Sequence, residues 1–138
     1  MRMRWTRSFT PWKQAAFSLI GIGLAGFLAF VYFFATREQL RFIGAHDLDK
    51  IPHFLGGVFI AIAYEWLAFR PRIWKLVLVV LAVTIAWEAY KYLFDLDVRY
   101  YAHHMTDLWR RDVMRDIAVA FLGSILWWLG FTDQHAKD

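Results

Sequence analysis

The sequence predicts an all-α integral membrane bundle of four transmembrane helices. Of its 138 residues, 59% are hydrophobic and 20% are aromatic, whereas soluble domains average nearer half apolar residues with about a quarter charged. The apolar residues come in blocks, most near the roughly 20 residues that a helix needs to cross a bilayer, and charged residues separate the blocks. One bundle accounts for the whole chain, so a single membrane domain is expected over residues 1–138.

The four blocks set the predicted spans. The first is too long for the apolar core of a signal peptide, so we expect it to be retained. Pro52 suits the first turn of the second span, and Pro71 marks the turn before the third because proline cannot continue the preceding helix. The segments between the first and second spans and between the third and fourth are expected to be polar loops. The predicted spans cover about residues 15–36, 52–69, 74–94 and 112–131.

Charge predicts the orientation and the partners. The net charge is +4 and cysteine is absent, which excludes disulfides and thiolate metal sites. The basic N-terminus and the turn at 70–72 favour cytoplasmic N- and C-termini under the positive-inside rule. In a membrane protein such positive charge matches anionic lipid. The lipid bilayer is therefore the expected partner, and no nucleic-acid binding is predicted.

Small and isolated polar residues within the spans are predicted to serve packing. Two spans carry glycines that would let helices approach closely and would permit a homo-oligomer. Glu65 is expected to pair with Arg70 or Arg72, and Ser124 to bond back to its own helix. The glycines are Gly21, Gly23, Gly26, Gly56 and Gly57.

Unusual polar residues gather on one predicted face of the bundle. In an up-and-down bundle, the start of the second span, the end of the third and the start of the fourth lie at the same end. Residues four apart share one side of a helix, so Asp49 can point with His53, and Asp112 with Asp116. Glu88 lies about two turns inside the end of the third span. We predict that these five residues share one outward-facing polar pocket.

Ionisable groups at membrane depth are costly and mark functional sites by default. One imidazole and four carboxylates suit a divalent metal such as Mg, Mn or Zn, so the predicted ligands are Asp49, His53, Glu88, Asp112 and Asp116. The metal would activate water to hydrolyse a lipid-linked substrate. In a metal-free version His53 is a general base oriented by Asp49 or Glu88. His53 and Glu88 are therefore the candidate catalytic residues.

Two other interpretations of the pocket stay open. The polar residues would form a purely structural network if the basic residues nearby neutralise the acids, and Glu88 and Lys91 stand at the three-residue spacing of a helical ion pair. Asp49 would then serve as a helix cap. Passage of an ion or a proton is the third interpretation. The basic residues are Lys91, Arg110, Arg111 and Arg115.

Three segments carry a resemblance to a known family. "DKIPHF", "AWEAYKYL" and "RRDVMRDIAVAFLGS" resemble the VanZ-like family of small integral membrane proteins, including a related bacterial inner-membrane group with Asp at both positions of the last pair. The resemblance covers about residues 49–130. It implies a protein of the bacterial cytoplasmic (inner) membrane linked to the cell envelope, and some members are linked to teicoplanin resistance. The matching residues are Asp49, Lys50, His53, Phe54, Glu88, Asp112, Asp116 and Gly123.

Overall fold

The described part of the chain is entirely helical, as predicted. A computed structural model describes residues 10–68, 71–93 and 107–132, and these residues contain no strand. The elements are α1 (Pro11–Ala29), the π-helix η1 (Phe30–Phe34), α2 (Arg37–Ala45), α3 (Lys50–Leu67), α4 (Ile73–Leu93) and α6 (Asp107–Phe131).

Three helical segments are long and apolar enough to cross a membrane. They are Pro11–Phe34, Ile73–Leu93 and Arg110–Phe131, which correspond to the predicted first, third and fourth spans. The predicted second span forms helix α3 but is not among these three. Lys50 and His53 near its start and Glu65 near its end lower its mean hydropathy. The sequence therefore contains the four predicted long helices, of which three qualify as spans by length and composition.

The predicted polar loop 37–51 is wrong over most of its length, because residues 37–45 form α2. A capping box starts this helix: the Gln39 amide nitrogen lies 3.3 Å from Thr36 Oγ1, and the Thr36 amide nitrogen donates to Gln39 Oε1 at 2.9 Å. The helix is also amphipathic, and its Leu40 and Ile43 line a partly open cavity. The chain then turns at Asp47, whose φ is 52°.

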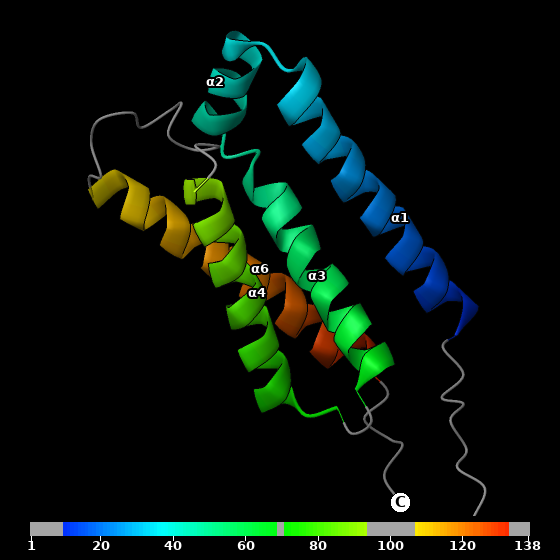
Figure 1. Cartoon of the computed structure of the whole chain (residues 1–138). Coiled ribbons are helices and arrows are strands. Elements are labelled where there is room, and N and C mark those ends of the chain that lie inside the picture. The colour runs from blue at the N-terminus through cyan, green and yellow to red at the C-terminus, as the bar shows by residue number, and fades with distance from the viewer. Residues whose placement is uncertain (1–9, 69–70, 94–106, 133–138) are drawn as a thin grey trace, which may run out of the picture.

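Helix α3 is the centre of the bundle. It lies between α1 and α4, it packs most extensively against α6, and α2 caps the space between the upper ends of α1 and α3 (Figure 1). The start of α1 and the end of α6 are at the same end, where the Trp12 and Trp127 rings lie 5.5 Å apart. The buried core joins three helices and consists of Val58, Ala61, Ile62, Leu76, Val80, Ala120, Trp127 and Trp128.

Two glycines allow α3 and α6 to touch through their backbones. A β-carbon at Gly57 would collide with the carbonyl group of Ala120, and one at Gly123 with the carbonyl oxygen of Phe54. The predicted packing role is thus confirmed for Gly57. The prediction that glycine allows a close helix contact within this chain is wrong for Gly23, Gly26 and Gly56, because a β-carbon at these positions would meet nothing within 4 Å.

A buried ion pair closes the opposite end of the bundle. Glu65 pairs with Lys13, whose Nζ lies 2.6 Å from Glu65 Oε1. Among the described residues it makes no ion pair with the predicted partner Arg72, and the other predicted partner, Arg70, lies outside the described residues. Lys13 is only 3% exposed. Trp127 Nε1 lies 3.5 Å from Glu65 Oε2. Charge and aromatic contacts therefore join α1, α3 and α6 at this end.

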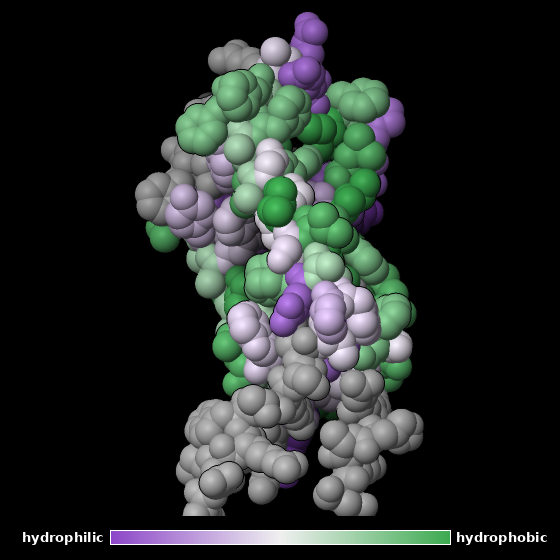
Figure 2. All heavy atoms as spheres, turned by 90° about the vertical axis from the view of Figure 1, so that its right-hand side faces the viewer, coloured by the Kyte–Doolittle hydropathy of each residue, from purple (hydrophilic) through white to green (hydrophobic). Residues whose placement is uncertain are grey.

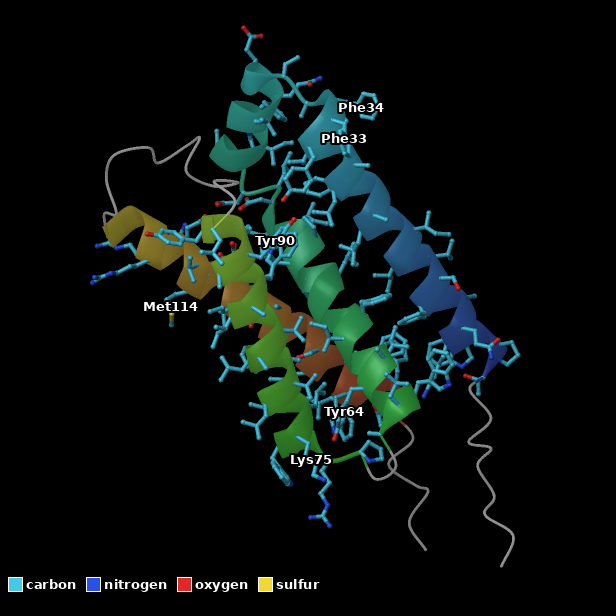
Figure 3. All side chains as sticks on the ribbon, viewed as in Figure 1. Phe33, Phe34, Tyr64, Lys75, Tyr90 and Met114 are labelled. Carbon is cyan, nitrogen blue, oxygen red and sulfur yellow. The ribbon has the colours of Figure 1, made fainter. Side chains whose placement is uncertain are left out.

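The outer surface of α1 is strongly apolar. Figure 2 looks onto the side of the molecule that carries α1 and shows hydrophobic residues over much of it. Phe33 and Phe34 project away from the bundle at the upper end of this helical segment (Figure 3), and they are 81% and 74% exposed. Exposed aromatic rings on a long apolar helix are typical of a lipid-facing surface.

We predict that Gly57→Ala and Gly123→Ala each destabilise the protein by about 1–3 kcal/mol, because the colliding atoms belong to a helix backbone that cannot move aside cheaply. Thermal unfolding in detergent measures the loss. Gly56→Ala is the matched control, since it adds the same methyl group to the same helix in open space. Equal stability of Gly57→Ala and Gly56→Ala would contradict the close packing.

Candidate functional site

Seven ionisable residues meet at one end of α3, α4 and α6, and we call them the polar cluster. Asp49 directly precedes α3, and Lys50 and His53 lie in its first turn. Spacings of three residues on α4 and four on α6 bring the other four side chains to the same side of their helices. The cluster comprises Asp49, Lys50, His53, Glu88, Lys91, Asp112 and Asp116.

The Lys50 ammonium group lies between three carboxylates. Its Nζ is 2.9 Å from Asp49 Oδ2, 2.6 Å from Asp112 Oδ1 and 2.5 Å from Asp116 Oδ1. An ammonium group has three N–H donors, so each carboxylate can accept one of them. Two of these acids are on α6, and Lys50 therefore ties the start of α3 to α6.

Asp116 is the most buried member of the cluster, with 1% of its surface exposed. Its second oxygen, Oδ2, lies 3.1 Å from His53 Nε2 and 3.4 Å from Lys91 Nζ. With Lys50 on its other oxygen, Asp116 contacts all three basic side chains of the cluster. A buried carboxylate needs such compensation, because an unpaired charge at this depth is very costly.

Glu88 extends the cluster along α4. Its Oε1 lies 2.9 Å from Lys91 Nζ, which confirms the predicted pair on one helix. Its Oε2 is buried and has no hydrogen-bond partner among the described residues, and the same holds for Asp49 Oδ1. Two carboxylate acceptors therefore remain unsatisfied within the cluster.

The structure brings the five predicted site residues together but changes their partners. His53 contacts Asp116 and not the predicted Asp49 or Glu88. Asp49 occupies the cap position of α3 without a side-chain capping bond, because its carboxylate contacts Lys50 instead. Asp49 therefore occupies the predicted cap position but makes no capping hydrogen bond there.

Lys50 is the residue that sequence reasoning missed as a counter-ion. The predicted neutralising residues were Lys91 and the arginines at 110, 111 and 115. Those arginines are exposed, and the cluster acids pair with Lys50 and Lys91. A signal for Lys50 does exist in the sequence, since Lys50 adjoins Asp49 and lies three residues before His53, on the same side of α3.

Two groups in the cluster have the spacing of metal ligands. One is His53, Glu88 and Asp116, and the other is Asp49, Asp112 and Asp116; within each group the ligand atoms lie within 4.8 Å of one another. The second group surrounds Lys50 Nζ, and the first borders Lys91 Nζ. A divalent ion would therefore have to displace an ammonium group that already binds the same oxygens. Metal binding stays a prediction.

A partly open cavity of about 330 Å³ reaches the polar cluster. Its walls are mostly apolar, with residues from α1, η1, α2, α3, α4 and α6. Asp49, His53, Lys91 and Asp112 supply most of its polar lining. The apolar lining includes Leu24, Phe27, Leu28, Val31, Leu40, Ile43, Ile60, Val83 and Trp87.

Comparisons with protein-family models, with curated proteins and with solved structures find no match for this chain. Its function must therefore be argued from the cavity and the polar cluster.

We predict that Lys50→Ala destabilises the protein by about 3 kcal/mol, because it leaves three carboxylates without their shared cation. Added Ca²⁺ or Mn²⁺ should restore much of the loss, since the freed oxygens match the preference of these ions. Thermal unfolding with and without the ion measures both effects.

The control is Lys75→Ala, which removes an exposed lysine at the opposite end of α4 (Figure 3). It should change stability little and show no ion rescue. The role of Lys50 would be contradicted if Lys50→Ala were as stable as wild type. It would also be contradicted if the added ion changed the stability of the variant and of wild type by the same amount.

Proposed function

We propose that this chain is a multi-pass membrane protein that binds an amphipathic, lipid-linked molecule between its helices. The observation that carries the proposal is a single cavity that has apolar walls and one charged end. Its walls of α1, η1 and α2 are mostly apolar, and Asp49, His53, Lys91 and Asp112 line its charged end. An apolar chain would lie along the walls while its polar group meets the cluster.

The size of the cavity suits part of such a molecule. Ligand pockets span about 300–1,000 Å³, and this cavity of about 330 Å³ is at the lower limit. Each methylene group moved from water into such walls gains about 0.8 kcal/mol, but a ligand arriving from the bilayer gains nothing from that transfer. Specificity must then come from the polar end.

The path of the chain supports four crossings. The start of α1 and the end of α6 meet at one end of the bundle. If that end faces one side of the membrane, the helices between these two points must cross the membrane an even number of times. Helix α3 runs alongside α1, and its 18 residues extend about 27 Å, which is near the thickness of the hydrocarbon core. We therefore propose α3 as the fourth span, with both termini in the cytoplasm.

The family resemblance fits the same proposal. Its three quoted segments contribute Lys50, Glu88 and Asp116 to one polar cluster, as expected if those motifs act together. We accordingly propose a VanZ-like protein of the bacterial inner membrane whose ligand is a lipid or cell-envelope precursor. Catalysis would fall to His53, which holds its ring against the buried Asp116 and could accept a proton from a bound group.

A structural role is the second candidate. It is favoured by the Lys50 ammonium group, which satisfies three carboxylates from two segments without any ligand. A network of this kind would lock α3 against α6. The cavity distinguishes the two candidates, because a purely structural cluster has no need of an apolar chamber beside it.

We predict that Gly56→Leu abolishes ligand binding without unfolding the protein. Gly56 lines the cavity, and a side chain there enters open space, so leucine would occupy the chamber. The measurement is photolabelling by a long-chain alcohol that carries a diazirine, with labelled peptides identified by mass spectrometry.

Wild type should be labelled on cavity-lining residues, and Gly56→Leu should lose that label at least about tenfold. Gly26→Leu is the control, since it also fills open space but lies outside the cavity lining. Labelling confined to outer residues such as Phe33 in all three proteins would refute the binding proposal.

A further inference from the structure

We infer that the polar group recognised by the cluster is a protonated primary amine, and that an anionic group such as phosphate is rejected. This inference rests on the proposed function, because it names the chemical class that the same cavity would select. The ligand would be a membrane-resident amphiphile with an apolar chain and an ammonium group.

The charge of the cluster is the first reason. Among the described residues, the cluster contains four carboxylates and the two ammonium groups of Lys50 and Lys91. It is therefore net negative by two charges with His53 neutral, and still negative with His53 protonated. A cavity with low-dielectric walls strengthens such a field, so a cation is attracted and an anion is repelled.

The unsatisfied oxygens are a second and independent reason. Glu88 is 7% exposed, and neither its Oε2 nor Asp49 Oδ1 finds a hydrogen-bond donor among the described residues. Asp49 lines the cavity, whereas Glu88 is outside the lining and contacts the lining residue Lys91. An ionised carboxylate only accepts hydrogen bonds, and a deprotonated phosphate likewise offers acceptors. No described residue supplies a donor to these oxygens, and the ammonium group of a ligand would bring several.

The lysines of the cluster do not reverse this preference. Lys50 Nζ already contacts three carboxylates, and Lys91 Nζ contacts Glu88 and Asp116. A phosphate approaching Lys91 from the cavity would have to compete with those acids. The nearby arginines at 110, 111 and 115 have exposed side chains and do not line the cavity.

The test is competition against the photoreactive alcohol that labels the cavity, using the whole protein in detergent. The competitors share one chain length and differ only in their head group: primary amine, trimethylammonium, alcohol or phosphate. We expect the primary amine to compete at a concentration about tenfold below the alcohol, which is the effect of one charge-assisted hydrogen bond. The phosphate should be the weakest competitor, and the trimethylammonium compound should fall below the amine because it lacks N–H donors.

The matched variants are Glu88→Gln and Glu38→Gln, which make the same change of charge. Only the first should reduce the ratio of amine to alcohol affinity, because Glu38 is exposed on α2. Asp49→Asn provides a second cluster variant if Glu88→Gln does not fold, and it should reduce the ratio in the same way.

The outcomes separate the two proposals. If the alcohol labels the cavity but the phosphate competes as well as the amine, the amine inference is overturned and the binding function stands. The amine inference is likewise overturned if neither cluster variant changes the ratio. If no probe labels the cavity, the proposed function fails and the inference fails with it. An aminophospholipid also carries a phosphate, so we expect phosphatidylethanolamine to compete less well than the free long-chain amine. Equal competition by these two compounds would overturn the rejection of phosphate.

Discussion

The upper end of this bundle depends on one lysine. Lys50 Nζ holds carboxylates from the start of α3 and from α6 within 2.9 Å, at the end of the helix pair whose backbones also touch at Gly57 and Gly123. Without the ammonium group, the carboxylates of Asp112 and Asp116 on α6 would repel one another and the carboxylate of Asp49, which precedes α3. The cavity borders this contact, so the position of its charged wall follows from the same interaction.

Much of the fold could be predicted because hydrophobic blocks and prolines are local signals. The third predicted span, 74–94, differs from α4 (Ile73–Leu93) by one residue at each end. Helix α2 was not predicted, because only part of the signal for it is local in the sequence. Its Thr36–Gln39 capping box is local, but its few apolar residues find their partners only in the cavity formed by helices distant in sequence. Residues 94–106, which include most of the other predicted loop, lie outside the described structure.

The members of the candidate site were easier to predict than their pairing. Spacing on each helix and the alternating direction of the helices bring Asp49, His53 and Asp116 to one end. Which base meets which acid depends on how deeply α3 and α6 pack, and that is set by the contact of Gly57 with Ala120. The cavity could not be predicted from the sequence, since its lining comes from six helical elements.

The most direct test of the Lys50 contact is a double-mutant cycle on Lys50→Met and Asp116→Asn, with the free energy of unfolding measured for wild type, both single variants and the double variant. We expect the double variant to lose less than the two single losses combined, with a coupling energy of at least about 1.5 kcal/mol. The reason is that each single substitution leaves the buried charge of the other residue without its counter-ion. Losses that add to within about 0.5 kcal/mol would mean that the Lys50–Asp116 contact does not hold α3 to α6.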